Sequence, residues 1–154
     1  MTNNGRLRAA TAHDCVELLG LWALLFDEGN TTPEVPWRGH AAEWFTGVVD
    51  DPSNARFPVI EVDGAIVATA IGTLELGVPN PQCIKGRTVR LANVITLAEH
   101  RARGHGTTLV LDVLDWARAV DADRVDLSAT PEGQRLYEKL GFTMTSAPRM
   151  KLTF

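Results

Sequence analysis

Two β-branched segments joined through one amphipathic helix constrain the fold of this chain most strongly. TVRLANVITL (residues 88–97) is typical of a strand, the residues up to about Val120 form a helix with one apolar side, and RVDLSAT (124–130) is typical of a second strand. Strands connected through a full helix run parallel, and such connections are right-handed. The chain is therefore expected to contain a parallel strand pair.

A hairpin is predicted upstream of this unit. In FPVIEVDGAIVATAIGTLEL, two β-branched segments flank Asp63 and Gly64, a pair typical of a two-residue turn. The other predicted elements are a strand at 6–11, helices at about 13–26 and 40–49, a short helix within PEGQRLYEKLGF, and a final strand, MKLTF. Val16, Leu19 and Leu24, within an almost wholly apolar stretch, predict deep burial of the first helix. These elements predict one α+β domain over residues 1–154, with a mixed sheet and with residues 1–5 as a loose tail.

Composition narrows the class of protein. Of the 154 residues 45% are hydrophobic and 22% charged, no apolar run approaches the roughly 18 residues of a membrane helix, and the N-terminus lacks a signal-peptide core. Cys15 and Cys83 form no disulfide pattern, so we expect a cytoplasmic protein that does not contact membranes. A net charge of −4 argues against nucleic-acid binding, and the four histidines lack the spacing of metal ligands, so no metal is expected.

An unusual turn precedes the helix of the parallel unit. Arg101, Arg103, Gly104 and Gly106 stand directly before its apolar residues. A helix that starts after glycines offers unpaired N–H groups and a positive dipole end, which together form an anion site. The alternative is a basic surface turn in which the glycines serve only the backbone. The pattern GxxxxGK[ST] is absent, and Leu109 stands where GxGxxG needs its third glycine, so two common phosphate-binding motifs are excluded.

At these residues the chain resembles the GNAT acyltransferase superfamily. NVITLAEHRARGHGTTLVL is similar to its coenzyme A motif, [Q/R]-x-x-G-x-[G/A], and RLYEKLGF to its later motif, whose tyrosine faces the sulfur of the coenzyme. The resemblance implies a three-layer fold with a central, mostly antiparallel sheet flanked by helices, acetyl-CoA as co-substrate, and a possible homodimer. The coenzyme-binding residues that it implies are Val94, Ile95, Thr96, Arg101, Ala102, Arg103, Gly104, His105, Gly106 and Thr107. An asparagine that many members place near the start of the last helix is missing from the stretch 129–132.

The resemblance implies a direct attack of an amine on acetyl-CoA. Tyr137, the single tyrosine of the chain, is expected to protonate the departing thiolate; its alternative is a core aromatic whose hydroxyl caps a backbone group. For the base we predict Glu75 or a water relay. Other candidates are the acidic residues of the first inter-helix region and one histidine, and three aromatic residues could wall the acceptor pocket. The acidic residues are Asp27, Glu28 and Glu34, and the histidine is His40. The aromatic residues are Trp37, Trp44 and Phe45.

The predicted function is an acetyl-CoA-dependent N-acetyltransferase that acts on a primary amine of a small molecule. Two alternatives stay open at this point. The acceptor could be a protein N-terminus or lysine, since these carry the same amine. The domain could also be a non-catalytic module that senses acyl-CoA, although Tyr137 favours an enzyme.

Overall fold

The computed structural model describes residues 5–26 and 36–154. Helices and strands follow one another in the order that the sequence predicts, except that a short strand at 55–56 is added and the final strand does not form. They are β1 (Arg6–Ala9), the 3₁₀ turn η1 (Ala12–Asp14), α1 (Cys15–Leu24), α2 (Pro36–Val48), β2 (Ala55–Arg56), β3 (Pro58–Val62), β4 (Ala65–Leu76), β5 (Arg87–Thr96), η2 (Ala98–His100), α3 (His105–Ala119), β6 (Arg124–Asp126) and α4 (Gln134–Lys139).

One mixed sheet organises the described part of the chain. Its strand order is β1-β3-β4-β5-β6, and the short β2 pairs with β4. Every pair is antiparallel except β5 and β6, which run parallel and are joined through α3. The predicted parallel unit is therefore confirmed. The predicted hairpin is confirmed as well: Asp63 and Gly64 have φ angles of 51° and 80°, as a two-residue turn between β3 and β4 requires.

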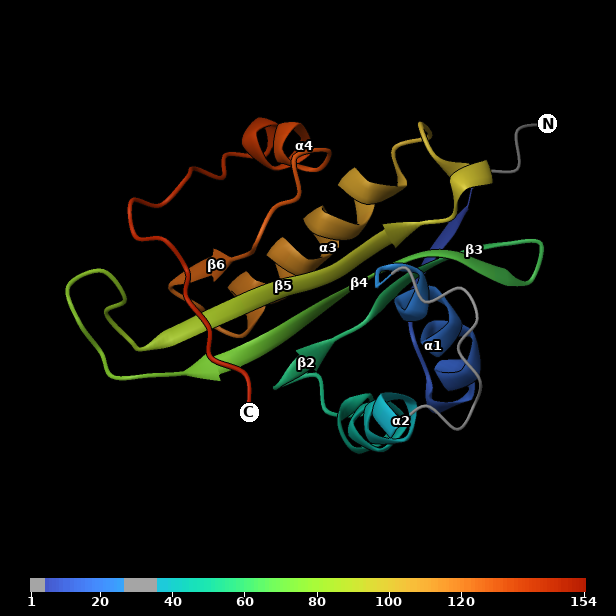
Figure 1. The fold of residues 1–154 in the computed structure, drawn as a ribbon, viewed down its shortest axis with the longest axis horizontal. Helices are drawn as coiled ribbons and strands as arrows, with labels where there is room; N and C mark the ends of the chain where they lie inside the picture. Colours follow the sequence, from blue (N-terminus) through green and yellow to red (C-terminus); the bar gives the residue numbers. More distant parts are fainter. Residues whose placement is uncertain (1–4, 27–35) are drawn as a thin grey trace.

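Helices cover both faces of the sheet, which gives three layers (Figure 1). On one face, α1 and α2 pack their aromatic residues against the sheet, and Phe45 and Leu18 are fully buried there. On the other face, α3 buries Leu109, Val110 and Val113 completely. Because α3 is apolar along one side only, it presents that side to the sheet and its polar side to solvent. The fold class expected from the sequence is confirmed.

Several predicted boundaries are wrong. The second helix starts at Pro36 rather than near His40, because proline suits the first helical position. The strand expected at 124–130 ends at Asp126, and the short helix begins at Gln134, after a turn that holds Pro131. Gly5, the last residue of the expected tail, lies against Ile60 of the sheet, while residues 1–4 lie outside the described residues. The ends of short elements depend on tertiary pairing, which local sequence does not report.

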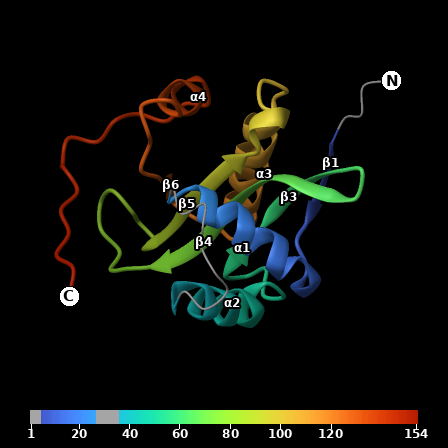
Figure 2. The ribbon, with the colours of Figure 1, turned by 45° about the vertical axis from the view of Figure 1, so that its right-hand side comes forward.

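Two further expectations fail for a shared reason. Residues 150–154 form no strand and leave Met150, Leu152 and Phe154 exposed, and Figure 2 shows the C-terminal segment running outside the sheet. Of the three residues expected to be buried in the first helix, Leu19 is buried, but Val16 and Leu24 are 80% and 51% exposed. In each case an apolar side chain is buried only where another part of the protein packs against it, and α1 packs against the sheet along one face only.

The close packing of α3 on β4 can be tested at Gly72. A Cβ at this position would lie 2.9 Å from Val113 Cγ1 and 3.0 Å from Trp116 Cζ3. Gly72→Ala should therefore overpack the interface and destabilise the fold by about 1–3 kcal/mol. Gly77→Ala is the control, since nothing lies within 4 Å of a Cβ there. Urea denaturation measures both variants, and equal stabilities would contradict this account of the interface.

Candidate active site

A β-bulge shapes the middle of the site. The pairing of β4 with β5 shifts so that Asn93 and Val94 stand opposite the single residue Ala70, and Asn93 has a φ of 51°. Such a bulge bends the strand and raises its local twist. The side chains beyond it divide between the two layers: Val94 packs on the α3 side and Ile95 on the α1–α2 side.

The outer edge of β5 is open beside this bulge. Parallel pairing with β6 covers only Thr88 to Arg90, and β6 ends at Asp126. Within the described chain, no strand lies against the outer edge of β5 from Leu91 to Thr96. The backbone of residues 94–96, which the sequence predicts to bind the coenzyme, therefore has no described strand on its outer side, and such an edge can bind an extended ligand.

The turn after β5 leads into the first turn of α3. Ala102 and Gly104 both have positive φ, 62° and 81°, and Gly104 is the N-cap of the helix. No side chain caps the helix, so the N–H groups of residues 105–107 have no intrahelical acceptor. Together with the positive dipole end, they form the uncapped helix start that an anion site needs.

The two arginines of the turn do different things. The Nε of Arg101 donates to the carbonyl of Thr96 at 3.1 Å, which ties the turn to the end of β5. Arg103 is exposed, and within the described residues no hydrogen bond or ion pair holds its guanidinium. Arg103 is therefore the more available of the two to bind an anion, whereas Arg101 stabilises the conformation of the turn.

His105 and Gly106 occupy the start of the helix. Burial lowers the pKa of His105, and electrostatic interaction with His100 and Arg103 lowers it further. Gly106 lies beneath α4: a Cβ there would come within 3.3 Å of Leu136 Cδ2. Gly106 thus permits α4, the helix that carries Tyr137, to approach α3, a role that sequence reasoning missed.

Tyr137 lines a cavity of about 430 Å³ between β5, β6, α4 and the C-terminal segment. Its ring is half-buried and packs edge-on against Phe142, with ring centroids 5.8 Å apart. Burial raises the pKa of the phenol. Among the described residues no group forms a hydrogen bond with its hydroxyl, which therefore does not cap a backbone group. The hydroxyl is a proton donor without a protein partner.

Glu75 is held by Arg90. Its Oε1 accepts a hydrogen bond from Arg90 Nε at 3.2 Å, and its side chain is 53% exposed. Glu75 stands opposite Thr88, and the seven residue-to-residue steps from Thr88 to Ile95 correspond to roughly 23 Å of strand. Arg90, however, lines the same cavity as Tyr137. The structure therefore connects Glu75 to the cavity through an ion pair and not by direct exposure.

The other predicted residues lie elsewhere. Phe45 is fully buried against Phe57 and Trp22, so it is a core residue. Trp37, His40 and Trp44 belong to α2, which does not line the cavity. Asp27, Glu28 and Glu34 lie outside the described residues. Sequence reasoning missed the charged residues that do line the cavity, Arg90, Asp126, Glu138 and Arg149.

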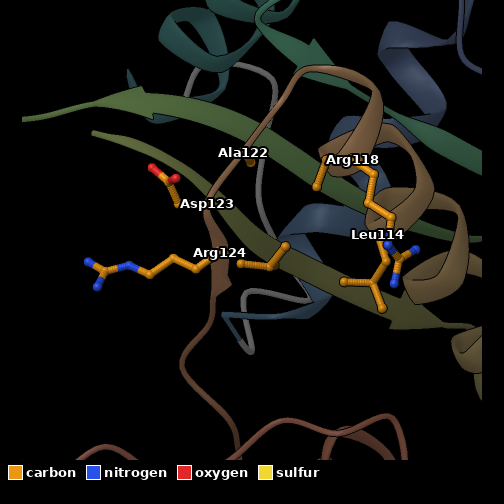
Figure 3. Close-up of a pocket in the computed structure, with 7 residues that line it drawn as sticks. Leu114, Arg118, Ala122, Asp123 and Arg124 are labelled. Atoms are coloured by element: carbon orange, nitrogen blue, oxygen red, sulfur yellow. The ribbon is translucent and has the colours of Figure 1, made fainter. Parts of the chain in front are cut away.

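A second hollow, of about 230 Å³, lies at the opposite end of α3 from the glycine turn. Leu114, Ala122 and the residues that follow line it, together with Arg118. Figure 3 shows the side chains of Arg118 and Arg124 pointing away from one another. Because its polar groups do not converge, this hollow is not a ligand site of the usual kind.

The fold and motifs match known acetyltransferases. Residues 19–142 match the Acetyltransferase (GNAT) family, and the chain belongs to this family. It is 34% identical over 82 residues to YhdJ, an uncharacterized N-acetyltransferase of Bacillus subtilis; the match covers 51% of this chain and 58% of that protein.

Solved structures are similar along nearly the whole chain. A predicted acetyltransferase from Clostridium acetobutylicum, solved with acetyl-CoA, has a TM-score of 0.84 at 19% identity, covering 97% of this chain and 96% of the other. Glucosamine-6-phosphate N-acetyltransferase from Arabidopsis thaliana has a TM-score of 0.77 at 19% identity, covering 96% and 97%. At these identities the similarity establishes the fold.

The described residues contain neither a membrane-spanning helix nor a cluster of metal ligands. No helix there has the length and apolar character needed to cross a membrane. Across residues 5–26 and 36–154, no three side chains of His, Cys, Asp or Glu gather as metal ligands would.

The left-handed conformation of Gly104 can be tested by itself. A Cβ on Gly104 would meet no atom within 4 Å, so Gly104→Ala measures only the strain of a positive φ, about 1–2 kcal/mol of destabilisation. Gly39→Ala is the control: it also has open space but lies within α2, where alanine should stabilise by roughly 0.5–1 kcal/mol. Denaturant melts that move both variants in the same direction would refute the assignment.

Proposed function

We propose that this protein is an acetyl-CoA-dependent N-acetyltransferase that transfers an acetyl group to a primary amine of a small molecule by direct attack. The observation that carries the proposal is the free, half-buried hydroxyl of Tyr137, which lines a cavity beside the open edge of β5. A cavity of about 430 Å³ is of the size that suits a small molecule, which favours such an acceptor over a protein side chain.

The coenzyme would bind along the outer edge of β5 and at the glycine turn. The open edge of β5 at Val94, Ile95 and Thr96 offers backbone groups to an extended pantetheine arm. The uncapped N–H groups of His105, Gly106 and Thr107 would bind the pyrophosphate, and Arg103 would add charge. Arg101 and Ala102 complete the turn that positions these groups. Acetyl-CoA in the similar Clostridium structure supports this assignment.

The amine has to be neutral when it attacks. An alkyl ammonium with a pKa of about 10.4 costs roughly 4 kcal/mol to deprotonate near pH 7.4, so desolvation or a proton acceptor must contribute. As the amine nitrogen bonds to the thioester carbon, an N–H of Ile95 or Thr96 stabilises the oxyanion. When the C–S bond breaks, Tyr137 donates its proton to the thiolate sulfur.

The compartment and the oligomeric state are proposed together with this function. Cys15 and Cys83 are both free, which is compatible with a reducing compartment, and we propose a cytoplasmic enzyme. A homodimer is proposed by family analogy, and size-exclusion chromatography with light scattering tests it.

Acetyl-CoA should stabilise the fold. Ligand at a hundred times its Kd should add about 2.7 kcal/mol to the free energy of unfolding. Gly104→Val should abolish this gain, because strain at the helix start misplaces the N–H groups, while Gly39→Ala should keep it. Thermal melts with and without coenzyme measure both effects. A wild-type melt unchanged by millimolar acetyl-CoA would overturn coenzyme binding, and stabilisation without turnover of any amine would favour the acyl-CoA sensor.

Tyr137→Phe tests the proton donor. The ring and its packing remain, so kcat should fall by about 10²–10⁴-fold while acetyl-CoA binding weakens by no more than about 0.5–1.5 kcal/mol. An acyl donor with a more acidic thiol should narrow the defect. Because burial raises the pKa of the phenol above its usual value of about 10, the loss of wild-type kcat through deprotonation of Tyr137 should occur at higher pH than for a free phenol. Full kcat in a destabilised variant would show that Tyr137 serves packing.

A further inference from the structure

Asp126 stands where β5 and β6 separate. It is the last residue of β6 and the register partner of Arg90. Its neighbour Val125 packs into the core on the α3 side, as do Val89 and Leu91 on either side of Arg90. Since side chains alternate along a strand, Asp126 and Arg90 project from the opposite face of the sheet. Both residues line the cavity that contains Tyr137.

The carboxylate of Asp126 has unused acceptor capacity. Its Oδ2 lies 3.5 Å from Arg124 Nε, a loose ion pair, and within the described residues no donor makes a hydrogen bond to it. The two neighbouring carboxylates are engaged: Glu75 accepts from Arg90, and Glu138 accepts from Gln134 at 2.6 Å. The side chain of Asp126 is 39% exposed, so a ligand in the cavity can reach it.

Tyr137 and Asp126 are complementary. One offers an O–H without an acceptor and the other an acceptor without a donor, and both line one cavity. An acyl transfer to an amine needs one group that gives a proton to sulfur and another that takes a proton from nitrogen. The charged groups that share the lining are Arg90, Arg149 and Glu138. Two arginines lie next to Asp126: Arg90 is its register partner on β5, and Arg124 is its loose ion-pair partner.

We propose that Asp126 is the catalytic residue that holds the attacking amine and accepts its proton. This assignment rests on the proposed acetyltransferase function. A carboxylate is too weak a base to deprotonate a free alkyl ammonium, so Asp126 acts later. The neutral amine donates an N–H hydrogen bond to the carboxylate while its lone pair attacks the thioester carbon.

Every proton is accounted for over one turnover. The new C–N bond leaves nitrogen positively charged and far more acidic than the free ammonium, and Asp126 takes its proton. The C–S bond then breaks, the sulfur leaves with the bonding pair, and Tyr137 protonates it. Water carries the proton from Asp126 to the tyrosinate, which restores both residues. The products are the amide and the free thiol.

The test compares two nucleophiles. The first is the primary alkyl amine that wild-type enzyme acetylates fastest from a panel, and the second is hydroxylamine, which is largely neutral at pH 7 and less dependent on a proton acceptor. Asp126→Asn should lower kcat/KM for the alkyl amine by about 10²-fold or more, and for hydroxylamine by clearly less. Background acetylation of hydroxylamine is subtracted from a reaction without enzyme.

Matched variants keep the result interpretable. Asp115→Asn removes an exposed carboxylate of α3 that does not line this cavity, and should stay within a few-fold of wild type for both nucleophiles. Asp126→Glu keeps the carboxylate and should retain part of the alkyl-amine activity, even if the asparagine variant folds poorly. Stabilisation by acetyl-CoA should persist in all three.

Two results would overturn the assignment. One is wild-type kcat/KM in Asp126→Asn, and the other is an equal loss for both nucleophiles with Asp126→Glu no better than Asp126→Asn. Failure of the proposed function is distinguishable, because wild-type enzyme would then acetylate none of the amines before any Asp126 variant is measured.

Discussion

Backbone pairing between β5 and β6 lasts for three register positions, and the candidate site depends on where it stops. Beyond Arg90 and Asp126, β5 bulges at Asn93 and the chain after β6 turns towards α4. If the pairing continued, β6 would form hydrogen bonds with the outer edge of β5, and that edge could not bind a ligand. The early separation leaves the outer edge of β5 at residues 94–96 without a partner strand among the described residues, and an unpaired sheet edge can bind an extended ligand.

Helix α3 serves both stability and binding. Its apolar side fills one layer of the core, where Leu109, Val110 and Val113 are wholly buried. The first turn of α3, by contrast, has no side-chain cap and begins after Gly104, which has a left-handed backbone conformation. Leaving a helix N-terminus without a cap costs about 0.5–2 kcal/mol, which burial of the helix face readily offsets. The same rigid element therefore positions the proposed phosphate site against the sheet.

Charge alternates across the cavity side of the sheet. Glu75 on β4 binds Arg90 on β5, which in turn stands beside Asp126 on β6, near Arg124. Such cross-strand pairs keep most of the charges engaged. Asp126 and Tyr137 differ from their neighbours in lacking hydrogen-bond partners within the described protein, and unengaged polar groups in a cavity are available to a ligand.

The sequence by itself determined the fold class, the Asp63–Gly64 hairpin, the parallel unit and the turn before α3, because turn chemistry and side-chain periodicity are local properties. It did not determine whether MKLTF pairs with the sheet or which side of α1 is buried. Nor did it show that Gly106 lets α4 pack close to α3. Those outcomes depend on contacts between residues distant in the chain. The same holds for the candidate base, because Glu75 and Asp126 look alike as acidic strand residues. Only the side-chain contacts of the folded chain separate them: Arg90 forms an ion pair with Glu75, whereas Asp126 has only a loose contact with Arg124 and lines the cavity of Tyr137.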